Sequence, residues 1–80
     1  MWIKHNKALY NSRDIAKIEV VKTHPTKLKA TFHDGSTEII GDFNTSKECE
    51  DIFGSVSRAL LFEFEDHPGI IIRDTKEKKR

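Results

Sequence analysis

The strongest constraint on the fold of this 80-residue chain is the stretch around Asp34 and Gly35. Before this pair, Leu28, Ala30 and Phe32 alternate with polar residues, as in a strand with one buried face. After it, the run Ser-Thr-Glu-Ile-Ile is also strand-like. An Asp-Gly pair between two such runs is preferred in a two-residue hairpin turn, because glycine accepts the positive φ that the turn requires. The sequence therefore predicts an antiparallel hairpin here.

Four other segments have the composition of strands. Residues 2–4 and 8–10 flank Asn6, whose tolerance of positive φ suits a tight turn, and they predict a first hairpin. Residues 15–22 are rich in β-branched residues, and their apolar and charged side chains alternate. Residues 70–72 are three consecutive isoleucines of strong β propensity.

One helix is predicted to begin at Thr45, after a break in the sheet at residues 41–44. Thr45 and Glu48 have the spacing of a capping box, in which each side chain bonds to the other's backbone N–H. Glycine is unfavourable inside a helix, so the presence of Gly54 predicts a close contact between the helix and the sheet at this position. Residues 60–65 fit either the last turns of the helix or a strand. Apolar residues recur at helical spacing and so predict one apolar stripe on this helix: Cys49, Ile52, Phe53, Val56 and Leu60.

These elements predict an α+β fold: an antiparallel β-meander of four to five strands, one main helix packed on one face, and a short C-terminal strand. The length suffices for a single domain, which we assign to residues 1–74. Residues 75–80 form a charged tail that is expected to be disordered.

Composition predicts a soluble protein of the cytoplasm. Cys49 is the only cysteine, so a disulfide within the chain and a cysteine-built zinc site are excluded. The apolar runs are too short for a membrane-spanning helix. The N-terminus lacks the charged-then-apolar order of a signal peptide.

The net charge is only +1, but the charges are segregated along the chain. Residues 1–30 carry seven Lys/Arg and two acids, residues 31–69 carry two and nine, and residues 70–80 carry five and two. This pattern fits an ordinary solvated surface, a basic face for an anionic ligand, or a basic face that meets an acidic face of another subunit. The small net charge argues against binding of nucleic acid through the basic sheet and tail.

No pattern of catalytic or metal-ligating residues is recognisable. The histidines fall at predicted turns or loop edges, and no two have the i, i+4 spacing of a helical metal site. The glycines are isolated, so no phosphate-binding loop is present. We therefore predict a protein that is not an enzyme and has no catalytic residue, metal site or cofactor. The histidines are His5, His24, His33 and His67.

Three arginines are the candidate ligand-binding residues: Arg13, Arg58 and Arg73. Each lies in or beside a predicted element, and a guanidinium group presents a flat fork of donors that suits phosphate or carboxylate. Arg58 also fits a salt bridge at the edge of the helix.

Three apolar residues are the candidate interface residues: Phe62, Phe64 and Ile71. A chain this small leaves some aromatic surface uncovered, and such surface marks a binding face. The isoleucine run places side chains on both faces of a strand, whereas one helix covers only one face. We therefore expect a homodimer or a higher even oligomer with Ile71, and Phe62 or Phe64, at the contact.

The order of elements resembles two groups of small bacterial and phage proteins. Residues 2–11 read Trp-Ile-Lys-His-Asn-Lys-Ala-Leu-Tyr-Asn and residues 14–20 read Asp-Ile-Ala-Lys-Ile-Glu-Val. Residues 32–35, Phe-His-Asp-Gly, and a helix follow. This opening is similar to that of flagellar regulatory proteins of the FlbD type and of phage anti-defence proteins, the Thoeris anti-defence sponges that sequester cyclic nucleotide signals. The resemblance covers about residues 2–60 as element order and identifies no functional residue.

Two main functions of different class remain open. The first is a non-enzymatic binding protein, encoded by a phage or mobile element, that sequesters an anionic nucleotide-derived signal. Its arginines would pair with phosphates while an aromatic side chain stacks on a base. The second is a regulatory protein-interaction module that inhibits or adapts a larger partner protein. Nucleic-acid binding is a weaker third alternative.

Overall fold

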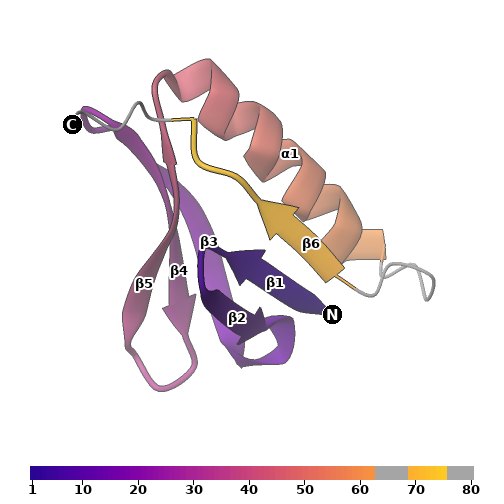
Figure 1. The fold of residues 1–80 in the computed structure, drawn as a ribbon. Coiled ribbons are helices and arrows are strands. Elements are labelled where there is room, and N and C mark those ends of the chain that lie inside the picture. Colours follow the sequence, from indigo (N-terminus) through magenta and orange to yellow (C-terminus); the bar gives the residue numbers. More distant parts are fainter. Residues whose placement is uncertain (63–68, 76–80) are drawn as a thin grey trace.

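A computed structural model of the chain describes residues 1–62 and 69–75 (Figure 1). The predicted α+β class is confirmed, with six strands in two three-stranded sheets and one main helix. The strand order is β2-β1-β6 in one sheet and β3-β4-β5 in the other. In chain order the elements are β1 (Trp2–His5), β2 (Ala8–Asn11), a 3-10 helix (Ser12–Asp14), β3 (Ile15–Val21), β4 (Thr26–Phe32), β5 (Thr37–Phe43), α1 (Ser46–Phe62) and β6 (Gly69–Ile72).

Sheet β2-β1-β6 is built from the two ends of the described chain. β1 and β2 pair antiparallel around Asn6, whose φ of 54° agrees with the predicted turn. β6 instead pairs with β1 in parallel, with Ile72 opposite His5. A parallel pair needs a long connection, and here the whole chain between β1 and β6, which includes sheet β3-β4-β5 and α1, supplies it. The predicted meander therefore describes β3, β4 and β5, and the C-terminal strand joins the first strand of the chain.

The predicted hairpin at Asp34 and Gly35 joins β4 to β5, but its loop is wider than a two-residue turn. The N–H of Gly35 donates to the carbonyl of Phe32, and the N–H of Phe32 donates to the carbonyl of Ser36. Gly35 has a φ of 92°, whereas Asp34 does not have a positive φ. A two-residue turn of the expected kind needs a positive φ at both central residues. The chain instead adopts a three-residue loop, in which only Gly35 needs a positive φ.

β5 continues through Phe43, so the expected break in the sheet at residues 41–44 is wrong. A bulge in the pairing with β4 leaves Ile40 without an opposite residue, and both Ile40 and Gly41 are buried. A Cβ atom added to Gly41 would lie 2.6 Å from a ring carbon of Phe43. The glycine therefore permits close packing within the strand and does not end it.

The helix begins as predicted. The N–H of Glu48 donates to Thr45 Oγ1, and the N–H of Thr45 donates to Glu48 Oε1, each at 3.2 Å. This reciprocal capping satisfies two N–H groups that have no partner inside the helix. The predicted stripe faces the sheets, with Cys49 and Val56 fully buried.

Two expectations for the rest of the helix have different outcomes. Gly54 does not touch the sheet, because a Cβ atom added there meets only Arg58 Nη1 of the same helix, at 3.7 Å. The expected contact is therefore wrong. α1 extends to Phe62, so residues 60–62 are helical. Phe64 and the side chain of Phe62 lie outside the described residues.

The core lies between the two sheets and α1, which runs beside β6 in Figure 1. Each sheet therefore has an inner face towards the core and an outer face. The buried hydrophobic residues of the described chain are Ile3, Leu28, Ala30, Ile40, Phe43, Cys49, Val56 and Ile72.

Candidate functional site

The outer face of sheet β2-β1-β6 gathers exposed apolar side chains. Trp2 is 51% exposed, Leu9 64% and Ile71 61%. Lys4 lies opposite both Leu9 and Ile71 in the strand registers, so these three side chains form one row across the sheet. Trp2 projects from the same face, two residues before Lys4 on β1. We call Trp2, Lys4, Leu9, Ile71 and Arg73 the basic–apolar face.

Arg73 belongs to this face because side chains alternate along the chain here. Ile72 is 2% exposed, and Asp74 hydrogen-bonds to the buried His5, so both point inward. Ile71 precedes Ile72, and Arg73 lies between Ile72 and Asp74. Both are exposed and point outward.

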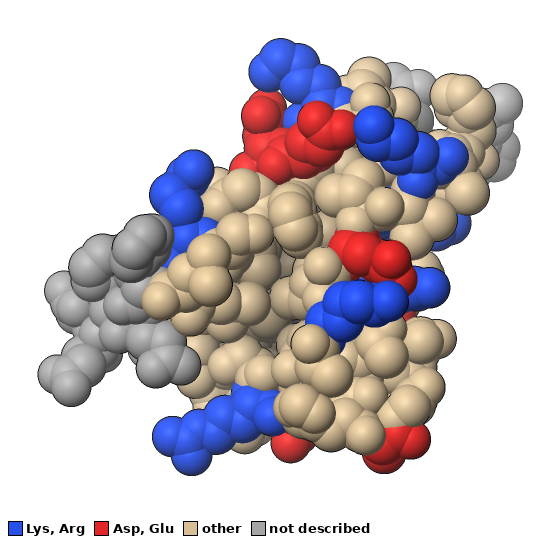
Figure 2. Space-filling view, turned by 180° about the vertical axis from the view of Figure 1, so that it is seen from behind, with Lys and Arg blue, Asp and Glu red and all other residues tan. Residues whose placement is uncertain are grey.

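Among the residues that the structure describes, the positive charge of the basic–apolar face is not balanced by acids. Strands β1, β2 and β6 contain no Asp or Glu. Within the described part of the chain, neither Lys4 nor Arg73 has an ion-pair partner. On the outer face of the other sheet, by contrast, Lys27 Nζ lies 2.6 Å from Asp42 Oδ1. Figure 2 shows the side turned away from the view of Figure 1, where positive and negative side chains are interspersed.

A cluster of polar residues fixes the end of β6 behind this face. His5 is only 7% exposed, and its Nε2 lies 2.8 Å from Asp74 Oδ1. The same oxygen accepts the N–H of Asp42 at 2.9 Å, and the N–H of Thr75 donates to the Asp42 carbonyl. Burial alone would raise the pKa of Asp74, but hydrogen bonds from Asp42 and His5 outweigh it and hold this pKa below its usual range. The cluster therefore favours the carboxylate and ties β6 to β5.

This cluster was not predicted from the sequence, where His5 was expected at the edge of a turn. His5 and Asp74 are 69 positions apart, and no pattern in either segment specifies that they meet. One signal could have found His5: it alternates with Ile3 on the inner side of β1. Thr75, assigned from the sequence to the tail, takes part in these bonds, and residues 76–80 lie outside the described residues.

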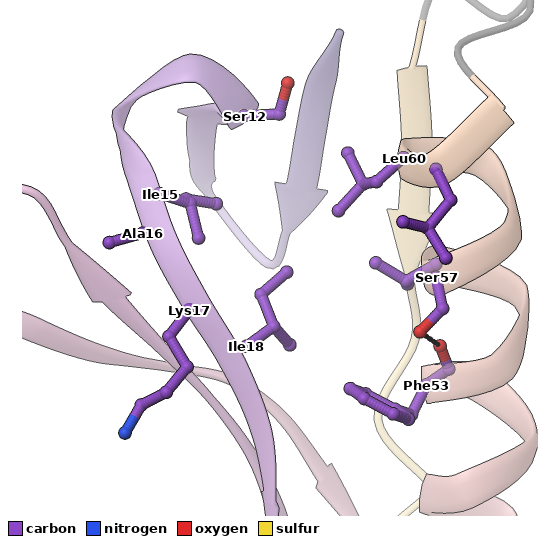
Figure 3. A pocket seen from close by; sticks show the side chains of 10 residues that line it. Ser12, Ile15, Ala16, Lys17, Ile18, Phe53, Ser57 and Leu60 are labelled. Carbon is purple, nitrogen blue, oxygen red and sulfur yellow. Dashed lines mark hydrogen bonds between the residues drawn. The ribbon is translucent and has the colours of Figure 1, made fainter.

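A hollow with a cavity volume of about 250 Å³ lies between β3 and α1. Figure 3 shows Phe53 and Leu60 of α1 facing Ile15 and Ile18 of β3 across it. The hydroxyl of Ser57 donates to the Phe53 carbonyl at 2.7 Å, so its proton is already engaged. The walls are mainly apolar, and the hollow offers no cluster of donors for an anionic ligand.

The three candidate ligand-binding arginines lie on separate elements. Arg13 follows β2 beyond one end of sheet β2-β1-β6, and Arg73 follows β6 beyond the other end. Arg58 lies on the exposed side of α1, with Nη2 3.5 Å from Ser55 Oγ. The arrangement of the strands therefore separates Arg13 from Arg73.

Neither a metal centre nor a reactive thiol is found in the described residues. No three His, Cys, Asp or Glu side chains among them are grouped so that they could hold a metal ion. Cys49 is buried, and this burial, together with the nearby Glu50 carboxylate, raises the pKa of its thiol. In the same part of the chain, no helix combines the length and apolar character needed to cross a membrane.

Comparison with protein-family models, with curated protein sequences and with solved structures finds no match. The resemblance to the anti-defence and flagellar regulatory proteins stays a prediction.

Proposed function

We propose that this chain is a cytoplasmic, non-enzymatic protein-interaction module that binds a partner protein through the basic–apolar face. The observation that carries the proposal is the row Leu9, Lys4 and Ile71, with Trp2 exposed beside it. Large apolar side chains gathered on one outer sheet face mark surfaces that become buried on association. Tryptophan and arginine are also the residues that most often dominate the binding energy of protein interfaces.

The aliphatic side chains favour a protein partner over a small phosphate-bearing ligand. Leu9 and Ile71 provide apolar area and no hydrogen-bond donor. A site for a small anion needs several donors that converge on it, and Arg13, Arg58 and Arg73 lie on separate elements.

Sequestration of an anionic nucleotide-derived ligand is the second candidate, and Trp2 is the observation that favours it. An exposed indole on a sheet, with Lys4 on the same strand, has the elements of a stacking platform for a base beside a cation for a phosphate. Titration with cyclic dinucleotides and ADP-ribose, followed by Trp2 fluorescence, tests this candidate. Saturable quenching that Lys4→Glu abolishes would favour it over a protein partner.

Self-association, expected from the sequence, would use the same surface through Ile71. A two-fold contact between two such faces would bring Lys4 and Arg73 of both copies together, and the strands of neither copy supply an acid. Like charges placed opposite one another oppose such a contact. We therefore favour a different protein, with acidic groups on its contact surface.

Site-specific photocrosslinking in cells that encode the chain tests the proposal. A benzophenone amino acid replaces Leu9, and the matched control replaces Thr37, which is exposed on the outer face of the other sheet. We expect a covalent conjugate with another protein from position 9 only. The purified partner should reproduce it, and Lys4→Glu should abolish it.

Three outcomes would contradict the proposal. Conjugates from both positions would indicate unspecific contact, and the absence of a conjugate from position 9 would leave the face without a partner. A conjugate with twice the mass of the 9.2 kDa chain would assign the face to self-association.

A further inference from the structure

We infer that the partner of the basic–apolar face presents an amphipathic helix that lies across the three strands and places an acidic residue, between two apolar ones, opposite Lys4. This inference rests on the proposed function and specifies its partner. The spacing of the row, the lack of an ion-pair partner for Lys4 among the described residues, and the position of Trp2 support it independently.

The spacing of the row matches a helix. Neighbouring strands lie about 4.8 Å apart, so Leu9 and Ile71 are separated by about 9.6 Å with Lys4 midway. In an α-helix, residues four and seven positions apart are separated by about 6 and 10.5 Å along the axis. A helix across the strands therefore brings residues i, i+4 and i+7 opposite the row. In an extended strand, side chains on one face recur about every 6.8 Å. The third such side chain would therefore lie about 4 Å beyond the end of the row.

The charge of the row determines the residue at the centre of the contact. A helix that covers Leu9 and Ile71 also removes Lys4 from water. Lys4 has no ion-pair partner among the described residues, and burying an unpaired ammonium group is strongly unfavourable. The helix must therefore supply Asp or Glu opposite Lys4. Arg73, at the edge of the same face, favours a second acid near the end of the helix.

Trp2 provides a further contact and a direct signal of binding. It lies about 6.7 Å along β1 from Lys4, just beyond the half-width of about 5–6 Å of a helix centred on the row, so its indole is placed against the flank of that helix. Its opposite residue on β6 is Gly69, so no side chain from that position covers the indole. Trp2 is the only tryptophan of the chain, and its fluorescence therefore reports on this face alone.

Two stapled helical peptides of equal length test the inference. Both carry leucine at positions i and i+7, and they differ only in glutamate or lysine at position i+4. Titrated into the purified full chain, the glutamate peptide should shift Trp2 fluorescence and bind more tightly than the lysine peptide by about tenfold or more. Lys4→Glu should invert this preference. The matched control Lys47→Glu, which makes the same change of charge on the exposed side of α1, should leave it unchanged.

The remaining outcomes separate the inference from the proposed function. If neither peptide binds but crosslinking at position 9 still gives a conjugate that purified partner reproduces, the helix is wrong and the proposed function stands. If both experiments fail, the proposed function fails as well. Equal binding of the two peptides overturns the role of Lys4. Quenching of Trp2 by oligothymidylate, abolished by Lys4→Glu, replaces the helix with a single-stranded nucleic acid.

Discussion

The Nε2 atom of His5 lies 2.8 Å from the Oδ1 atom of Asp74, and this contact joins the first strand of the chain to the residues that follow the last one. Asp74 also accepts the N–H of Asp42, so the same carboxylate links both sheets. Because side chains alternate along the chain, an Asp74 fixed inward keeps Ile71 and Arg73 outward. The cluster behind the basic–apolar face therefore stabilises the face itself.

Replacement of Asp74 by alanine should destabilise the fold. The substitution leaves the buried His5 ring nitrogen and the Asp42 N–H without their acceptor, and such a loss costs about 1–3 kcal/mol. Urea denaturation at neutral pH measures the change in the free energy of unfolding. Glu38→Ala is the matched control, because Glu38 is exposed, and it should change that free energy by less than about 0.5 kcal/mol. Equal effects of the two substitutions would contradict the role given to Asp74.

The contribution of Asp74 should disappear in acid. The pKa of its carboxyl is lowered in the folded chain, so its stabilising effect is complete above the unfolded pKa, about 3.9. It is then lost as the pH falls through the lower folded pKa. The difference in unfolding free energy between wild type and Asp74→Asn should therefore be larger at about pH 5 than at about pH 2. Glu19 and Asp34 also have lowered pKa values, through hydrogen bonds from Lys29 and Ser36. Both residues are present in the wild type and in the variant, so their contributions cancel in the difference. A difference that does not change with pH would refute this assignment.

Replacement by alanine should change the free energy of unfolding in opposite directions at two glycines. Gly54 lies on the open side of α1, so Gly54→Ala should raise the free energy of unfolding by about 0.5–1 kcal/mol through higher helix propensity. Gly41→Ala should lower it by about 1–3 kcal/mol, because the new methyl group would overlap the Phe43 ring. Thermal and urea denaturation of the two variants side by side measure both effects. Destabilisation by Gly54→Ala would contradict the open placement of Gly54 and indicate that another part of the protein contacts α1 there.

The sequence predicted the elements whose signals are local. The turn at Asn6, the positive φ of Gly35 and the Thr45–Glu48 capping box all depend on residues within a few positions of one another. Gly41 shows the limit of such reasoning, since a glycine that ends a strand and one that admits a neighbouring ring look the same in sequence.

Most of the candidate site depends on distant pairing, which local patterns do not specify. The isoleucine run predicted a strand and an outward Ile71, but not that β1 would be its parallel neighbour. That neighbour brings Lys4 between Ile71 and Leu9 and so creates the row. Lys4 and Leu9 are unremarkable in sequence because an exposed residue becomes part of a binding face only through the strands beside it.

Ile71 and Ile72 should behave differently although they are adjacent and chemically identical. Ile72 is 2% exposed and packs in the core, so Ile72→Ala should lower the free energy of unfolding by about 2–5 kcal/mol. Ile71 is 61% exposed, so Ile71→Ala should lower it by less than about 1 kcal/mol in the isolated chain and act on partner binding instead. Urea denaturation over a range of protein concentrations measures both. If Ile71→Ala is as costly as Ile72→Ala, and wild-type stability rises with concentration, the side chain is buried between copies, because stability that depends on concentration is the sign of an assembly. That result would replace the separate partner protein with a second copy of this chain.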